Sequence, residues 1–276
     1  MIVCDVCPRA CRLEDGTTGF CGVRVNRDGM NIDMLYRCLY DTQGPYFGGL
    51  IAFLPGCNLK CWYCGLPFLW KTPSAKYQHT SESELVSQAS SLGCGGICLF
   101  GGEPALHHEY ILEAARLCRQ KGLETILTTN GFIAPWLAQL YGTAIDVPVV
   151  GIKGSGSPRL YADMSADPKI CLRTAKILWQ ANKRTQITDL IGPGLKYTEQ
   201  DDREFAEWIC GNISADVSVR LECLKDPASS TDLTIPLRHI GGESDATTRA
   251  FETAKRFQDA GLRDVQLPLS MNPQIR

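Results

Sequence analysis

The sequence has 276 residues, of which 44% are hydrophobic and 21% are charged, which is enough for a substantial globular core. Its formal net charge is −2, so no global basic field favours nucleic acid or an anionic membrane, and we expect neither as a partner. Fourteen cysteines, with no apolar stretch of bilayer length and no apolar secretory segment, predict a cytoplasmic, oxygen-sensitive metalloprotein and argue against a secreted disulfide scaffold.

Residues 1–30 form a predicted cysteine-rich metal-binding segment. Glycines in this segment allow the positive-φ turns that fold several sulfurs around one centre. Four thiols complete a closed site, and both zinc and a second [4Fe–4S] cluster fit it. The predicted ligands are Cys4, Cys7, Cys11 and Cys21. Residues 31–49 alternate weakly and are interpreted as a linker or short strand.

The apolar residues 50–54 predict a buried strand, and a group of three cysteines follows it directly. Cys57, Cys61 and Cys64 have the spacing Cys-x3-Cys-x2-Cys. A four-iron cubane takes one ligand per iron, so three thiolates leave one iron open to a small molecule. The alternative is a structural zinc, or a cluster whose fourth cysteine lies elsewhere.

A helix start is predicted at residues 80–84, where acidic residues precede an apolar pattern. Residues 95–100 predict the second strand, which leads into Gly101, Gly102, Glu103 and Pro104. The two glycines allow a close backbone approach to a ligand, and Glu103 can accept a hydrogen bond from a charged amino group. His107 and His108 are interpreted as local hydrogen-bonding residues.

Helix 109–121 is predicted to end at Gly122, and strand 125–129 leads to Thr129 and Asn130. Helix 134–141 and strand 146–153 follow, and Lys153 lies at the end of that strand. A lysine at this position can meet a carboxylate.

The remaining sequence predicts helix 166–179, strand 186–191, a helix capped by Thr198 and ending at 209, strand 217–223, helix 246–260 and a final run at 264–268. Arg220, Glu222 and Cys223 on strand 217–223 are candidate pocket residues. Strands and helices that alternate in this way predict the α/β class, with a parallel sheet covered by helices.

The three-cysteine motif with Tyr63 before its last cysteine, followed by Gly101-Gly102-Glu103-Pro104, resembles the radical S-adenosylmethionine (SAM) superfamily. The resemblance implies a partial (β/α)6 barrel over residues 50–276, a [4Fe–4S] cluster on the three cysteines, and SAM bound at the open iron. It also implies that residues 101–104 bind the methionyl end of SAM, with Glu103 as the acceptor for the amino group. Thr129 and Asn130 would face the ribose, and Lys153 would meet a carboxylate of SAM or of the substrate.

The N-terminal cysteines and the Gly192-Pro193-Gly194 turn are similar to those of glycyl-radical-enzyme activases, including pyruvate formate-lyase activating enzymes, and of the AmmeMemoRadiSam group. Those activases commonly carry Asp-x-Lys where this chain has Gly151-Ile152-Lys153, so the lysine is kept and the acid is lost. The resemblance implies a protein or peptide substrate and an electron donor such as flavodoxin or ferredoxin. The rival hypothesis is an enzyme acting on a small molecule or nucleoside in cofactor biosynthesis, and the third is a non-catalytic iron–sulfur electron carrier.

Overall fold

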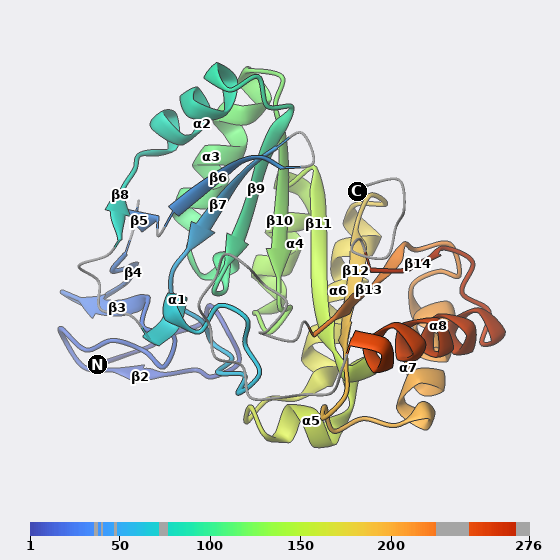
Figure 1. Cartoon of the computed structure of the whole chain (residues 1–276). Coiled ribbons are helices and arrows are strands. Elements are labelled where there is room, and N and C mark those ends of the chain that lie inside the picture. The colour runs from blue at the N-terminus through green and yellow to red at the C-terminus, as the bar shows by residue number, and fades with distance from the viewer. Residues whose placement is uncertain (36–37, 40, 47–48, 72–76, 225–242, 269–276) are drawn as a thin grey trace. The chain divides into compact units, whose positions relative to one another are not determined.

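Strands and helices alternate along the chain from residue 49 onward, as the sequence predicts (Figure 1). The computed structural model describes residues 1–35, 38–39, 41–46, 49–71, 77–224 and 243–268. The chain divides into two units: the first comprises Met1–Lys60 and Leu66–Val149, and the second comprises Cys61–Gly65 and Val150–Arg276.

The sheet of the first unit has the strand order β10-β9-β7-β6. The strands are β6 (Asp41–Tyr46), β7 (Gly49–Leu54), β9 (Gly96–Gly101) and β10 (Glu124–Thr129). β7, β9 and β10 are parallel, and Leu54 pairs with Gly101, so β7 and β9 end side by side. This register brings the Cys57 and Glu103 segments together at the carboxyl edge of the sheet.

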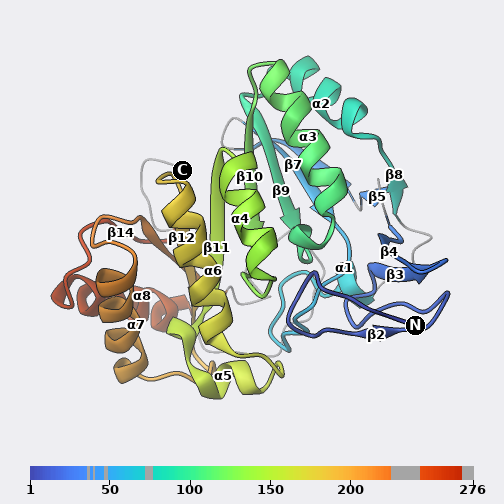
Figure 2. The same ribbon diagram turned by 180° about the vertical axis from the view of Figure 1, so that it is seen from behind.

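Helices α2 (Glu82–Ser91) and α3 (His108–Gln120) pack on this sheet (Figure 2). Ser81 caps α2, and Glu84 completes the capping box, which satisfies backbone N–H groups of the first turn. The buried face of α3, which includes Ile111, Ala114 and Cys118, contacts β9 and β10. The chain leaves α3 through Gly122, whose φ of 69° confirms the predicted helix end. Helices α1 (Phe68–Lys71) and α4 (Pro135–Ala144) and the 3₁₀ turn η2 (Pro104–Leu106) complete the first unit's helices in the described part of the chain.

The N-terminal residues form small antiparallel pairs. β1 (Ile2–Val3) pairs with β2 (Arg12–Leu13), and β3 (Arg24–Arg27) pairs with β4 (Met30–Asp33). The β3–β4 turn consists of Asp28 and Gly29 at φ values of 53° and 81°, the tight hairpin turn that Asp-Gly favours.

The predicted linker or short strand at residues 31–49 contains more structure than the weak alternation indicated. β5 (Cys38–Leu39) pairs with β8 (Gln78–His79), and β6 pairs antiparallel with β7 at the edge of the sheet. Residues 36–37, 40 and 47–48 of this stretch lie outside the described residues. The edge strand has its partner on one side only, so its sequence carries a weaker hydrophobic pattern than a central strand.

The second unit continues the alternation. Its parallel strands β12 (Gln186–Ile191), β13 (Val219–Cys223) and β14 (Val265–Gln266) follow β11 (Val147–Lys153), whose first three residues belong to the first unit. The helices are α5 (Pro158–Ala162), α6 (Pro168–Ala181), α7 (Glu199–Asn212) and α8 (Glu243–Asp259), with the 3₁₀ turn η3 (Gly154–Gly156) after β11. Thr198 caps α7 through a capping box with Asp201, as predicted for this helix start. The α/β class, with a helix after each of the parallel strands β7 and β9 to β13 in the described chain, is confirmed.

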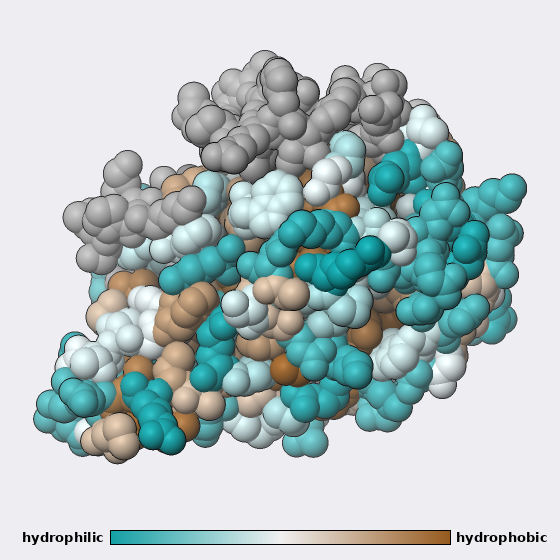
Figure 3. All heavy atoms as spheres, turned by 90° about the horizontal axis from the view of Figure 1, so that it is seen from below, coloured by the Kyte–Doolittle hydropathy of each residue, from teal (hydrophilic) through white to brown (hydrophobic). Residues whose placement is uncertain are grey.

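Within the described residues, no helix combines the length and the apolar character needed to cross a bilayer. On the face drawn in Figure 3, hydrophobic residues form separate patches among hydrophilic ones.

Candidate active site

The carboxyl ends of β7 and β9 are joined by direct backbone hydrogen bonds. The Gly102 N–H donates to the Leu54 carbonyl at 2.9 Å, and the Glu103 N–H donates to the Gly56 carbonyl at 2.7 Å. A Cβ atom at Gly102 would lie 1.9 Å from the Gly56 oxygen, and one at Gly101 would lie 2.7 Å from the Leu54 oxygen. From the sequence, these glycines are expected to allow the close approach of a ligand. In the structure the close approach is that of the chain's own backbone, so the glycines first of all allow the two strand ends to meet.

The Glu103 carboxylate is fully buried and is held by three donors of the protein. Its Oε1 accepts hydrogen bonds from the Thr129 hydroxyl at 2.7 Å and the Ala105 N–H at 3.1 Å. Its Oε2 accepts the Asn130 N–H at 2.6 Å. The structure therefore brings together Glu103, Thr129 and Asn130, three of the residues that the resemblance assigns to SAM binding. Pro104 opens the η2 turn that Glu103 caps.

Asn58 belongs to the same cluster, and sequence reasoning did not single it out. Its side chain is buried, donates to the Phe132 carbonyl at 2.6 Å and accepts from the Asn130 amide at 2.9 Å. The Asn130 amide also lies 3.8 Å from the Cys57 sulfur. The only signal in the sequence was an amide side chain placed directly after the first cysteine of the motif.

Cys61 and Cys64 belong to the second unit, where the Cys64 N–H donates to the Cys61 carbonyl at 3.2 Å. Burial raises the pKa of the Cys61 thiol, while the nearby Lys153 ammonium lowers it. The Cys61 sulfur lies 3.1 Å from the Met164 sulfur, and the buried Tyr63 donates its hydroxyl hydrogen bond to the same sulfur at 3.4 Å. Lys153 thus lies within electrostatic range of a predicted cluster ligand.

The pocket candidates on β13 pair with each other. The Arg220 Nε donates to the Glu222 Oε1 at 2.9 Å, and both side chains are partly exposed. Burial raises the pKa of the Cys223 thiol to about 11, so this thiol is protonated at neutral pH. A role for these three residues in a pocket stays a prediction.

Residues 51–209, more than half of the chain, match the family model of the Radical SAM superfamily. The chain belongs to the radical SAM superfamily. It is 26% identical to the pyruvate formate-lyase 1-activating enzyme of Escherichia coli over 55% of this chain and 63% of that protein. It is also 26% identical to an uncharacterized protein of Methanocaldococcus jannaschii over 69% of this chain and 60% of that protein. The chain therefore spans about three fifths of the length of these curated relatives.

The solved structure of Streptococcus suis SuiB bound to the precursor peptide SuiA shares the fold, with a TM-score of 0.59 and 17% sequence identity over 79% of this chain and 47% of that chain. Membership of the radical SAM superfamily makes this chain an enzyme and implies a [4Fe–4S] cluster and SAM as cofactors. The residues of this chain fit a cluster and SAM, because Cys57, Cys61 and Cys64 have the spacing of the motif. The buried Glu103 carboxylate is held near Cys57 by Thr129 and Asn130.

The second cysteine group of this radical SAM protein lies in the first unit, and all four thiols are free. Sulfurs of this group accept N–H hydrogen bonds. The Asn31 amide donates to Cys4 at 3.4 Å, and the Phe20 N–H donates to Cys11 at 3.5 Å. The N–H groups of Val23 and Arg24 donate to Cys21, each at 3.5 Å. N–H groups directed at sulfur are typical of thiolates that bind a metal or a cluster.

Cys7 completes this group. Burial raises the pKa of its thiol to about 11, against hydrogen bonds from the Arg9 backbone and the Asn58 side chain, and the neighbouring Cys21 and Cys4 raise it further. Among the residues with described positions, no three or more cysteine, histidine or acidic side chains are already arranged around a metal position. The N–H donors around the sulfurs are the observation that supports metal binding here.

The second unit contains a buried polar cluster after β11 that the sequence did not reveal. The Ser155 N–H donates to both Asp189 oxygens at 3.0 and 3.1 Å. The Ser155 hydroxyl oxygen lies 2.9 Å from Asp189 and 2.6 Å from Asp202, which also accepts from the Arg256 Nε at 2.8 Å. A hydroxyl has one proton, so both contacts are hydrogen bonds only when one carboxyl group is protonated. Burial raises the pKa of Asp189 to about 7, with Asp202 adding to the shift and Lys153 opposing it, so Asp189 is the group that holds the proton.

Replacing Asp189 with asparagine is expected to flatten the dependence of stability on pH. The folded protein binds the Asp189 proton more tightly than the unfolded chain does. The contribution of this proton to the free energy of unfolding is complete near pH 4 and is lost as pH rises through about 7. The loss over this whole pH range is on the order of 4 kcal/mol. Asparagine keeps the acceptor for the Ser155 N–H and the donor to its hydroxyl without a titrating proton.

The measurement is thermal unfolding of the anaerobic, metal-containing protein at several pH values between 5 and 8. The difference between wild type and Asp189→Asn reports the titration of Asp189 together with its coupling to Asp202, because the titrations of the more distant groups are shared. Asp202→Asn is the matched control. It leaves Arg256 without its buried carboxylate partner and is expected to destabilise the protein at every pH. Parallel curves for wild type and Asp189→Asn would contradict the assignment.

Proposed function

We propose that this enzyme holds a [4Fe–4S] cluster on Cys57, Cys61 and Cys64 and binds SAM at the iron that these thiolates leave open. When bound, the two cofactors supply reductive cleavage of SAM to a 5′-deoxyadenosyl radical that abstracts a hydrogen atom from a substrate. An external one-electron donor such as flavodoxin or ferredoxin would reduce the enzyme. The observation that carries the proposal is the buried Glu103 carboxylate, fixed by Thr129 and Asn130 next to the Cys57 segment.

The residues of the first unit would orient the methionyl end of SAM. A carboxylate is a strong acceptor for a charged amino group, so Glu103, which accepts the Asn130 N–H at its Oε2, would accept a hydrogen bond from the ammonium group of SAM. Three internal donors hold this carboxylate in one orientation before any ligand arrives. Gly101, Gly102 and Pro104 set the backbone path around it, and Lys153 of the second unit would meet a carboxylate.

Replacing Glu103 with glutamine is expected to weaken SAM binding at least tenfold, because a charge-assisted hydrogen bond is worth about 1.5–3 kcal/mol. The amide NH₂ would also face at least one of the donors Thr129, Ala105 and Asn130. The iron content should not change. Binding is followed as the SAM-dependent change in the electron paramagnetic resonance (EPR) spectrum of the reduced cluster. Glu113→Gln, which changes an exposed glutamate on α3 that pairs with Arg116, is the matched control. Equal SAM affinities of wild type and Glu103→Gln would remove Glu103 from the SAM site.

The proposed substrate is a protein or a peptide. The likeness to the pyruvate formate-lyase 1-activating enzyme of Escherichia coli, which is named after another enzyme, supports this class. Anaerobic incubation with SAM, a reductant and deuterated candidates tests it through the appearance of deuterium in 5′-deoxyadenosine. Transfer from a protein fraction supports the proposal. Transfer from a metabolite fraction alone would replace it with the small-molecule or nucleoside enzyme, and SAM that is bound but never cleaved would favour the electron carrier.

The N-terminal cysteines Cys4, Cys7, Cys11 and Cys21 are proposed to bind a second metal centre, either a [4Fe–4S] cluster or zinc. The N–H donors around their sulfurs support both. Metal analysis of anaerobically prepared protein separates them, because two cubanes give about eight irons per chain and a zinc site gives about four irons with one zinc.

A further inference from the structure

The turn that carries the first cluster cysteine is held by the N-terminal cysteine segment. We call residues Pro55 to Asn58 the Cys57 turn. The Cys57 N–H donates to the Cys21 carbonyl at 3.1 Å, and the Arg9 Nε donates to the Asn58 carbonyl at 2.8 Å. The Asn58 side chain lies near the Cys7 thiol and lowers its pKa, against the larger effect of burial. Two of the four N-terminal cysteines therefore lie beside this turn.

Gly56 shows how closely the two segments fit. Its φ is +79°, and a Cβ atom there would lie 2.0 Å from the Cγ2 of Val23 and 3.0 Å from the Cys21 carbonyl oxygen. Val23 is fully buried and lies just before β3. The turn thus needs glycine both for its backbone conformation and for the space that the N-terminal segment takes up.

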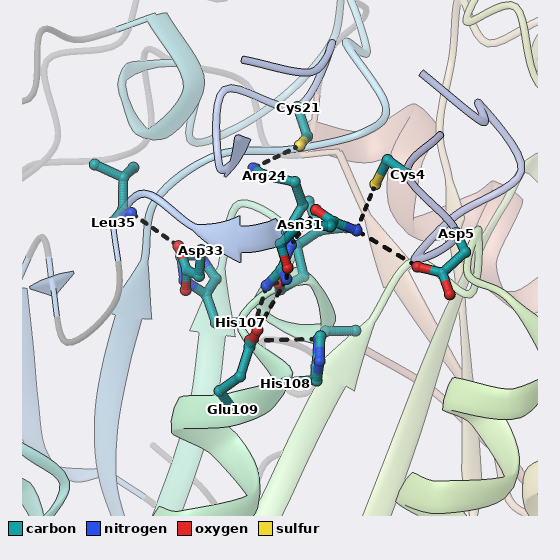
Figure 4. A network of polar contacts seen from close by, with 12 residues as sticks. Cys4, Asp5, Cys21, Arg24, Asn31, Asp33, Leu35, His107, His108 and Glu109 are labelled. Atoms are coloured by element: carbon teal, nitrogen blue, oxygen red, sulfur yellow. Dashed lines mark hydrogen bonds and ion pairs between the residues drawn. The ribbon is translucent and has the colours of Figure 1, made fainter. Parts of the chain in front are cut away.

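Pro55, the first residue of the turn, is held through a buried histidine. The His107 Nε2 lies 2.7 Å from the Pro55 carbonyl, and its Nδ1 lies 2.6 Å from the Asp33 carboxylate at the end of β4 (Figure 4). Burial alone would lower the pKa of His107, but the charge and hydrogen bond of Asp33 outweigh it and raise that pKa. Both ring nitrogens face acceptors, so the charged imidazolium donates to both and ties the β3–β4 hairpin to the turn. His107 is a hydrogen-bonding residue, as predicted, but its partners Asp33 and Pro55 lie 74 and 52 positions away, so its role is not the local one that was expected.

A second ion pair, between the buried Arg24 and the partly exposed Glu109, fixes the same hairpin on helix α3. Arg24 is buried and forms two hydrogen bonds to the Glu109 carboxylate, each at 2.8 Å, and a third to the Asn31 carbonyl at 2.7 Å (Figure 4). The Asn31 side chain in turn donates to the Cys4 sulfur. Hydrogen bonds therefore connect the Cys4 sulfur to the β3–β4 hairpin. The hairpin is connected in turn to helix α3 through Glu109 and to the Cys57 turn through His107.

We propose that metal binding at the N-terminal cysteines positions the Cys57 turn, so that filling this site prepares the enzyme for its SAM-cleaving cluster and for SAM. The inference rests on the proposed function for both metal sites. The N-terminal segment consists of short strands and tight turns and is too small to hold its shape by a hydrophobic core alone, so a structural metal is the expected support. Without that metal, the Cys57 turn loses partners at Pro55, Cys57 and Asn58 together.

The test removes the N-terminal metal without removing a contact to the turn. Cys4→Ser combined with Cys11→Ser changes two predicted ligands, while the side chains of Arg9, Cys7 and His107 and the carbonyl of Cys21 remain. The expected result is loss of the N-terminal metal, at least tenfold faster hydrogen exchange of the peptide containing residues 55–58, and at least tenfold more SAM needed for the EPR change. Cys94→Ser combined with Cys210→Ser, two cysteines outside both sites, is the control and should behave as wild type.

A second variant breaks the connection and leaves every cysteine in place. Arg9→Gln should keep the N-terminal metal and still raise both the exchange rate of residues 55–58 and the SAM concentration needed for the EPR change. Arg9→Lys should restore part of the effect, because lysine keeps a charged donor near the Asn58 carbonyl and the charge over the Phe20 ring. Arg12→Gln, at an exposed position of the same segment, is the matched control.

The proposal is overturned if the Cys4/Cys11 variant loses its N-terminal metal but keeps wild-type exchange and SAM response. It is also overturned if the wild-type protein holds a SAM-responsive cluster and no N-terminal metal, and in that case the proposed enzymatic function stands. A wild-type protein with no SAM-responsive cluster would instead defeat the proposed function, while the exchange rates of residues 55–58 still report on the coupling.

Discussion

A chain in which Cys57, Cys61 and Cys64 are all replaced by alanine is expected to lose SAM cleavage entirely. The three thiolates are the proposed holders of the cluster, and the electron that breaks the sulfonium bond has no other route to SAM. The expected loss is therefore complete, with 5′-deoxyadenosine at the level of a reaction without enzyme. The measurement is chromatographic detection of 5′-deoxyadenosine after anaerobic incubation with SAM and dithionite.

The same variant should keep its N-terminal metal. Alanine at position 57 retains the backbone N–H that donates to the Cys21 carbonyl, so the contact between the two segments survives the loss of the thiol. The matched control replaces three buried or half-buried cysteines outside both sites with alanine, namely Cys94, Cys98 and Cys118. Cleavage should persist in the control. Cleavage that persists in the Cys57/Cys61/Cys64 variant would end the assignment of these residues as cluster ligands.

Much of the candidate site followed from sequence because it depends on local pattern and on strand order. In a parallel sheet the carboxyl ends of neighbouring strands meet at one edge, so placing Glu103 after one strand and Thr129 and Asn130 after the next was enough to predict that they lie together. In the structure Thr129 and Asn130 donate hydrogen bonds to Glu103, and the binding of SAM by these residues stays a prediction. Capping patterns at Ser81 and Thr198 were equally local and equally predictable.

Contacts between segments that are distant in the sequence could not be predicted from local pattern and strand order. The Cys21–Cys57 hydrogen bond and the Asp33–His107–Pro55 connection join residues that periodicity and spacing treat independently. Asn58 was overlooked for the same reason, since its partners Asn130 and Phe132 lie more than 70 positions away along the chain. The pairing of Asp189 with Ser155 and Asp202 likewise depends on which buried carboxylates the fold brings within hydrogen-bonding distance.

Replacing Gly102 with alanine is expected to destabilise the protein and to damage the SAM site together. The added Cβ would lie 1.9 Å from the Gly56 carbonyl oxygen, and a backbone atom cannot move away by a change of side-chain rotamer. The ends of β7 and β9 must then separate, which breaks the 2.7 Å hydrogen bond from the Glu103 N–H to Gly56. The expected loss is about 3 kcal/mol in the free energy of unfolding, with SAM affinity falling at least tenfold as Glu103 shifts.

Thermal unfolding and the SAM-dependent EPR change, measured on the same preparation, separate the two roles that a glycine can have at this position. If Gly102 served only the close approach of a ligand, alanine would weaken SAM binding and leave the unfolding temperature unchanged. Gly211→Ala is the matched control, because this glycine near the end of α7 has nothing within 4 Å of its added Cβ. Alanine is favoured there by about 0.5–1 kcal/mol, so the same substitution should raise the unfolding temperature at Gly211 and lower it at Gly102. Gly102→Ala could instead have the unfolding temperature and the SAM affinity of wild type. That result would show that the ends of β7 and β9 are not held as closely as the hydrogen bond from Glu103 to Gly56 requires.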